Sequence, residues 1–244
     1  RSHCDWSSDV CSSDLIFTFL GFCAFAKAVA IFSMPSKPIV DSPHTNPFGN
    51  MKYIIKDKSF GYVLLTWFIM GFANLWTLPL RVDYVTAPEW VIEVSAIYVA
   101  MIITIIPETI RMILIPFWAS LFDKMNFVVL RMILNLFFGC GVLLFFVTSN
   151  PWVIGMGSAL IGAAFAGGSI AWNLWVTKYA PPGKAGAYMS VHVSLTGIRG
   201  TIGPILGYWT VNLIGARNIG IVSFVMMFFA TLMLIPEIKH GAKR

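Results

Sequence analysis

Residues 188–207 read YMSVHVSLTGIRGTIGPILG. The stretch is apolar and has the length of a membrane-spanning helix, about 20 residues, yet Arg199 lies near its middle. A charged side chain at the centre of a membrane helix costs about 2.5–3.5 kcal/mol on insertion scales, so it normally faces a partner or a wet cavity. The stretch therefore predicts a membrane helix with a polar face.

That face can be identified from the spacing of the polar and small residues. The residues at i, i+4, i+7 and i+11 are His192, Thr196, Arg199 and Gly203. Residues with this spacing lie on one side of an α-helix. The glycines at 197, 200, 203 and 207 favour close approach of a neighbouring helix, and Pro204 can interrupt the hydrogen-bond ladder.

Composition extends the membrane interpretation to the whole chain of 244 residues. Hydrophobic residues make up 57%, charged residues 11%, and the mean hydropathy is +0.77; soluble proteins have about 25% charged residues. The net charge of +6 does not indicate nucleic-acid binding, because the basic residues lie in short loops between apolar runs. The four cysteines form neither a disulfide framework nor a metal-binding pattern, and no cofactor motif is present.

The first fourteen residues, RSHCDWSSDVCSSD, differ from the rest. They contain no initiator Met, basic n-region or cleavage-site pattern, so they do not form a signal peptide. They resemble translated sequencing-adapter sequence, and we interpret residues 1–14 as a non-native leader.

Apolar windows of spanning length predict an all-α integral membrane protein with seven transmembrane helices. The expected spans are residues 15–33, 60–80, 94–122, 127–147, 152–177, 186–214 and 219–236. Asn126 is expected to cap the fourth span, and Asn150 with Pro151 to begin the fifth.

Loop charges predict the orientation, since Lys and Arg accumulate on the cytoplasmic side. With the N-terminus outside, the outer loops hold two basic residues, Arg81 and Arg217, against eleven in the inner loops and tail. The inner set is Lys37, Lys52, Lys56, Lys58, Lys124, Arg131, Lys178, Lys184, Lys239, Lys243 and Arg244. The tail, residues 237–244, is therefore expected in the cytoplasm.

Residues 34–59 form the longest connection, contain four prolines and end in the basic, amphipathic segment NMKYIIKDKSFGY. One interpretation is a solvated linker with a segment lying on the membrane surface. The other is a hinge between two helical bundles, of which only residues 60–236 form a complete one. A single span before a long linker favours a truncated chain, in which residues 15–33 are the last helix of an earlier bundle.

The third span carries Glu108 near its midpoint and Arg111 one turn further on. Pro107 and Pro116 should bend the helix around these residues. The two charges form either a structural ion pair or part of a functional site, since intramembrane charges usually mark function. Glu108 has the same expected depth as Arg199, which makes a cross-helix pair possible.

Polar residues on other spans are weaker candidates. Asn74 on the second span and Asn173 on the fifth are candidate polar contacts, whereas Asn135 is expected to bond a neighbouring helix. Trp172 and Trp175 favour an interfacial aromatic belt, with a stacking surface as the alternative. Small residues of the fifth span, at 155, 162 and 166, indicate a close-packing face.

The chain resembles the C-terminal half of a major facilitator superfamily transporter in three features. These are six spans after a basic loop, an Asp–Lys turn after the third span, and the Gly/Pro-rich sixth span. The resemblance covers residues 15–244. Its Gly-x-x-x-Asp-Arg/Lys-x-Gly-Arg-Arg turn is matched at 119–127 by ASLFDKMNF, which keeps Asp123 and Lys124 but lacks both glycines and the first arginine. The resemblance implies a conformational, gating role for Asp123, Lys124 and Arg131, and a cavity lined by the second, third, fifth and sixth spans.

The resemblance implies a secondary transporter in the bacterial inner membrane that moves a small solute by alternating access, together with the missing N-terminal half. We expect Glu108 to bind a proton or pair alternately with Arg199, Arg111 or Arg199 to attract an anionic group, and His192 with Asn173 to supply polar contacts. The alternative is a non-transporting membrane sensor or interaction protein of the same fold. An enzyme is not expected, since HExxH, GxSxG and paired intramembrane aspartates are absent from the sequence.

Overall fold

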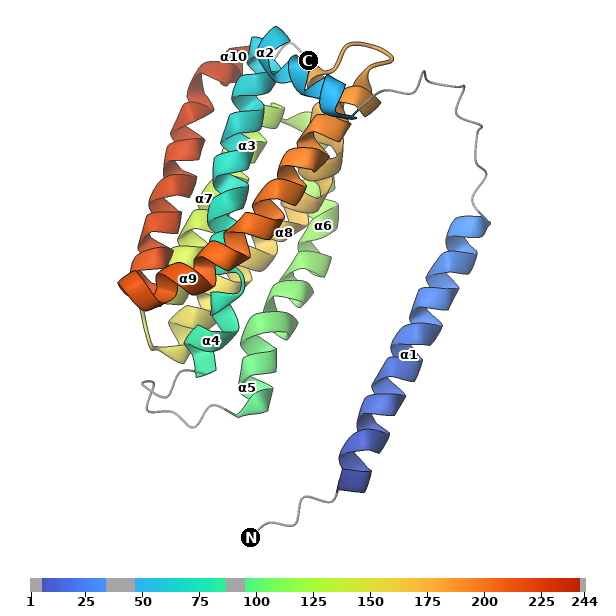
Figure 1. The fold of residues 1–244 in the computed structure, drawn as a ribbon, viewed down its shortest axis with the longest axis vertical. Coiled ribbons are helices and arrows are strands. Elements are labelled where there is room, and N and C mark those ends of the chain that lie inside the picture. Colours follow the sequence, from blue (N-terminus) through green and yellow to red (C-terminus); the bar gives the residue numbers. More distant parts are fainter. Residues whose placement is uncertain (1–5, 34–46, 87–94, 242–244) are drawn as a thin grey trace. The chain divides into compact units, whose positions relative to one another are not determined.

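The computed structural model describes residues 6–33, 47–86 and 95–241, which are helical with short connections and contain no strand (Figure 1). The chain separates into two units, Arg1–His44 and Thr45–Arg244. In the first unit, helix α1 (Trp6–Phe32) begins within the expected leader rather than at residue 15. Its described apolar part, Gly21–Phe32, is shorter than a membrane span. The non-native origin of the leader stays a prediction, and residues 1–5 lie outside the described part.

In its described residues the second unit is a bundle of long apolar helices. Its long helices are α3 (Lys58–Thr77), α6 (Ile106–Lys124), α7 (Phe127–Phe146), α8 (Pro151–Tyr179) and α9 (Ala185–Met233). Its short elements are η1 (Pro47–Met51), α2 (Lys52–Lys56), α4 (Leu80–Thr86), α5 (Ala96–Ala100), η2 (Met101–Ile105), η3 (Ile235–Glu237) and α10 (Ile238–Gly241). In the described residues, five helices are long and apolar enough to cross a membrane, so the fold class is confirmed and the expected count of seven is not.

Helix α9 covers the sixth expected span and residues 219–233 of the seventh. Gly215 in its middle has φ 78° and ψ 154°, a backbone conformation that glycine adopts without steric cost. The chain reverses there, so residues 185–214 and 216–233 form two arms that run in opposite directions (Figure 1). The predicted break between residues 214 and 219 therefore corresponds to a real turn.

The third expected span is a continuous helical segment made of α5, η2 and α6, and η2 is an irregular turn within it. Ser95 caps α5 by accepting a hydrogen bond from the backbone N of Tyr98 at 3.3 Å. The π-helical turn η2 follows and ends just before Pro107. A wide turn suits this position, because proline has no N–H to donate to the preceding turn. The irregularity expected from Pro107 thus lies in the turn before it.

Side-chain caps begin the next two helices at the predicted residues. Asn126 Oδ1 accepts from the backbone N of Val128 at 2.8 Å, and Asn150 Oδ1 accepts from the backbone N of Trp152 at 3.0 Å. Both caps satisfy a donor that would otherwise lack a helical partner. The predicted starts of α7 and α8 are confirmed.

Small residues bring neighbouring helices into close contact. A Cβ placed on Gly157 of α8 would lie 2.8 Å from the carbonyl oxygen of Gly141 on α7, and one placed on Gly203 of α9 would lie 2.9 Å from Cβ of Leu75 on α3. Both positions therefore require glycine for the observed spacing. By contrast, Gly197 and Gly200 have open surroundings and make no such approach.

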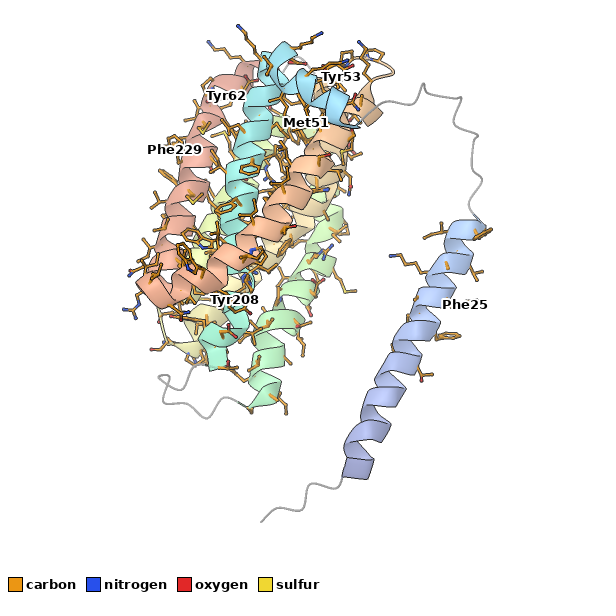
Figure 2. All side chains as sticks on the ribbon, in the orientation of Figure 1. Phe25, Met51, Tyr53, Tyr62, Tyr208 and Phe229 are labelled. Atoms are coloured by element: carbon orange, nitrogen blue, oxygen red, sulfur yellow. The ribbon has the colours of Figure 1, made fainter. Side chains whose placement is uncertain are left out.

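The described segment before α3, residues 47–57, packs on the bundle. Asn50 Nδ2 donates to Ser190 Oγ at 2.9 Å. The ring of Tyr53, which is labelled in Figure 2, stacks on that of Tyr188 with centroids 4.8 Å apart. Tyr188 in turn donates to Oδ2 of Asp57 at 3.2 Å. The compact unit therefore begins before the expected boundary at residue 60. The expected linker residues 34–46 lie outside the described part.

The outer surface of the bundle is apolar and its two ends differ in charge. Side chains such as Tyr208 and Phe229 are 52% and 56% exposed on α9 (Figure 2). Exposed apolar side chains over long helices suit a hydrocarbon environment. The lysine-bearing α2 and α10 lie at one end of the bundle and α4 at the other (Figure 1).

Candidate functional site

A cavity of about 340 Å³ lies among the five long helices of the bundle. Such a volume falls at the lower end of the range for small-molecule sites, about 300–1,000 Å³. Its lining residues are Trp67, Met70, Gly71, Asn74 and Leu75 of α3, Arg111 of α6, Arg131 and Phe138 of α7, Phe165, Gly168, Ser169 and Trp172 of α8, and Thr196 and Arg199 of α9. The lining therefore combines apolar and aromatic groups with three arginines.

Arg131 contributes one of the positive charges. Its side chain is buried, its Cζ lies 3.5 Å from the ring centroid of Trp67, and its Nη2 lies 3.2 Å from the sulfur of Met70. The aromatic face stabilises the cation, while the thioether is only a weak acceptor. Arg131 was expected to join Asp123 and Lys124 in a gating role; it lies in the lining of the cavity, and the gating role stays a prediction.

Arg199 of α9 contributes the second charge. It donates to the backbone oxygen of Trp67 and, through Nη2, to Oγ1 of Thr196 at 3.3 Å. Its Cζ lies 5.1 Å from the ring centroid of Trp172. The guanidinium occupies space next to Gly71 that a β-carbon would fill. The predicted shared face of His192, Thr196 and Arg199 therefore points into the bundle.

Glu108 does not pair with Arg199. Its carboxylate oxygens each accept from Nη1 of Arg111 at 3.3 Å, one turn along α6. The pair is open to the surroundings, with exposed fractions of 54% for the Glu108 side chain and 37% for that of Arg111. The equal depth expected for Glu108 and Arg199 therefore did not bring them together, and Glu108 pairs with Arg111 on its own helix.

His192 lies beside the cavity, and its ring contacts the indole rings of three tryptophans. Its ring centroid is 5.4 Å from that of Trp67, 4.4 Å from that of Trp172 and 5.3 Å from that of Trp175. Its Nε2 is buried and has no hydrogen-bond partner among the described residues. Trp175 is fully buried, so the aromatic-belt interpretation is wrong for it, and Trp172 lines the cavity. The expected contact of His192 with a solute stays a prediction.

The asparagines have different surroundings. Asn74 lines the cavity, and its Oδ1 accepts from Nη2 of Arg81 at 2.9 Å. Arg81 is buried in α4 rather than exposed in an outer loop. Asn173 is exposed and donates to the backbone oxygen of Ser169 at 2.9 Å, outside the cavity lining. Asn135 is buried without a hydrogen-bond partner in the described part of the chain, so the expected interhelical bond is not observed.

The expected gating turn is not assembled as one cluster. Asp123 and Lys124 are exposed at the end of α6, and the N-terminus of α7 is capped by Asn126 rather than by Asp123. Arg131 lies apart from them in the cavity. The gating role of Asp123 and Lys124 stays a prediction.

The family model for the Major Facilitator Superfamily matches residues 92–244, which is more than half of the chain. The chain belongs to the major facilitator superfamily. It is therefore a multi-pass membrane protein of a transporter family, as the turn at Asp123 and Lys124 and the glycine-rich α9 indicated. No curated protein and no solved structure matched the chain.

The cavity lining differs in one helix from the lining that the superfamily resemblance implied. We expected the cavity to be lined by the second, third, fifth and sixth spans, but α7, the fourth span, also contributes Arg131 and Phe138. Arg131 is the one charged residue in the twenty of α7. Arg199 was predicted to be a site residue because it is an isolated arginine in an apolar span, and the same reasoning could have predicted Arg131 as a site residue. No comparable signal in the sequence singled out Trp67.

Proposed function

We propose that the chain is part of a secondary transporter that moves a small solute by alternating access. The cavity described above forms one wall of the solute site, and a second bundle of the same protein forms the other. Sites of this kind lie near the middle of the membrane between halves that rock against each other. The proposal goes beyond family membership in naming the cavity and the mode of transport.

The observation that carries the proposal is the convergence of Arg111, Arg131 and Arg199 on one cavity from three helices. Each charge is costly in an apolar bundle, and such residues usually face a solute pathway. A purely structural role would favour pairing with acidic groups, yet only Arg111 has a carboxylate within salt-bridge distance among the residues described.

We propose the bacterial inner membrane as the location, with the C-terminus in the cytoplasm. The support for the orientation is the charge difference between the ends of the bundle, because positively charged loops remain in the cytoplasm. Lys52 and Lys56 of α2 and Lys239 of α10 lie at the end that would face the cytoplasm (Figure 1).

Proton coupling through Glu108 is the mechanism we propose for driving transport. Protonation of Glu108 removes the negative charge that pairs with Arg111. Because Arg111 lines the cavity, its guanidinium can then bind a solute there. Solute binding and protonation would thereby favour each other, which is the requirement for coupling two ligands.

Uptake into vesicles containing the full-length protein tests both parts. We expect an inward proton gradient to accelerate solute uptake, and Glu108→Gln to abolish that acceleration. Asp83→Asn is the matched control, since Asp83 is an exposed acidic residue on α4. Unchanged gradient-driven uptake in Glu108→Gln would refute the coupling. If Glu108→Gln and Arg199→Gln left the cellular phenotype intact while changes in residues 34–59 or 239–244 abolished it, the non-transporting alternative would replace the proposal.

A further inference from the structure

We propose that the cavity binds an organic anion with a compact acidic group and an aromatic or otherwise flat apolar body. This inference rests on the proposed transport function and adds the chemical class of the solute. It follows from the charge balance of the lining, from the free donors on the buried arginines and from the apolar character of the remaining surface.

The described lining carries three positive charges and no acidic side chain. Arg131 and Arg199 are only 2% and 3% exposed, and neither has a carboxylate within salt-bridge distance in the described part of the chain. A buried charge without a counter-charge costs several kcal/mol, since water no longer solvates it. An anionic solute would supply the missing counter-charge, whereas a cationic solute would add repulsion.

The donors of Arg199 are only partly used by the protein. Nη1 donates to the Trp67 carbonyl and Nη2 makes a long bond of 3.3 Å to Thr196, while Nε has no partner among the described residues. Arg131 Nη2 has only the sulfur of Met70 at 3.2 Å. Planar guanidinium groups bind carboxylates through pairs of parallel hydrogen bonds, which are about twice as strong as neutral ones. Donors therefore remain for a carboxylate between these two arginines.

The rest of the lining disfavours a bare inorganic anion. Asn74, Ser169 and Thr196 add polar groups, but a large part of the lining offers no hydrogen bond to an oxygen atom: Met70, Leu75, Phe138 and Phe165. An inorganic phosphate there would leave several oxygens without partners, which is unfavourable in an apolar site. An aromatic ring on the anion would instead bury apolar surface against these side chains and against Trp172.

Calorimetric titration of the detergent-solubilised full-length protein tests the proposal with four probes of related shape or charge. These are benzoate, its neutral analogue benzamide, the cation benzylammonium and inorganic phosphate. We expect benzoate to bind with a Kd at least about tenfold lower than that of any other probe, because only it has both the charge and the ring. Equal binding of benzamide, or tighter binding of benzylammonium or phosphate, would overturn the proposal.

Substitutions of Arg199 test whether this residue binds the carboxylate of benzoate. Arg199→Gln should weaken benzoate binding about tenfold to a hundredfold, Arg199→Lys should recover part of the affinity through its charge, and benzamide binding should not change. Arg217→Gln is the matched control, because Arg217 is exposed after the turn at Gly215. If Arg199→Gln does not fold, the comparison of benzoate with benzamide on the unaltered chain decides alone. Undiminished benzoate binding in a folded Arg199→Gln would refute the assignment.

Benzoate binding and solute uptake test the anion site and the transport function separately. Benzoate binding without any solute uptake in vesicles would support the anion site and reject the transporter. Uptake of a neutral or cationic solute, with no binding of benzoate, would support the transporter and reject the anion site.

Discussion

The guanidinium of Arg131 lies over the indole of Trp67, with Cζ 3.5 Å from the ring centroid, and the ring of His192 contacts the same indole edge-on at 5.4 Å. Trp67 also supplies the backbone oxygen that binds Arg199. One residue of α3 therefore positions both buried arginines of the cavity, from helices α7 and α9. The stability of the bundle and the charge of the cavity are consequently linked at Trp67.

Replacement of Arg131 by Met should reduce benzoate binding without reducing stability. The cation–π contact contributes about 2 kcal/mol at most, while removal of an uncompensated buried charge relieves a cost of similar or greater size. We expect the free energy of unfolding in detergent to stay within about 1 kcal/mol of the original or to rise. Arg217→Met is the control. A loss of more than about 2 kcal/mol would show that Arg131 is primarily structural.

Gly71→Ala should displace Arg199, since the new β-carbon would occupy the position of the guanidinium. We expect a loss of about 1–3 kcal/mol in stability, as in other overpacked interiors, together with weaker benzoate binding. Gly200→Ala is the matched control on α9, where nothing lies within 4 Å of the added carbon. That control should be neutral or stabilising by up to about 1 kcal/mol. Equal effects of the two substitutions, measured by thermal unfolding, would contradict the observed packing.

Glu108 should be energetically coupled to Arg111 and not to Arg199. A double-mutant cycle on Glu108 and Arg111 should give about 0.2–1 kcal/mol, the range for exposed ion pairs. The cycle on Glu108 and Arg199 should give a value within about 0.3–0.5 kcal/mol of zero, the usual limit for independent sites. A larger coupling between Glu108 and Arg199 would indicate that the two pair in another conformation of the transporter.

Asn126 should hold the C-terminal segment as well as cap α7. Its Oδ1 accepts from Val128, and its Nδ2 donates to the backbone oxygen of Ile238 at 2.8 Å. Asn126→Ala and the control Asn150→Ala each remove a helix cap and should each cost about 0.5–2 kcal/mol. Only Asn126→Ala should accelerate trypsin cleavage at Lys239. Identical cleavage rates in the two variants would show that the bond to Ile238 does not restrain the tail.

Local patterns in the sequence predicted the membrane fold, the break near Gly215, the caps at Asn126 and Asn150 and the buried face of α9. Each depends on residues close together along the chain: hydropathy over a span, a side chain at a helix start, or spacing around one helix. Even the superfamily was indicated by short motifs, and the match over residues 92–244 confirmed it.

The tertiary structure alone decided which polar residues meet. Depth along a helix is readable from sequence, but the rotation of that helix against its neighbours depends on how all the side chains pack. For this reason Glu108 pairs with Arg111 on its own helix and stays exposed, whereas Arg131 lies buried beside Trp67. The sequence by itself determined a membrane helix bundle with costly internal charges. The packing of five helices determined that Arg111, Arg131 and Arg199 converge on a single cavity.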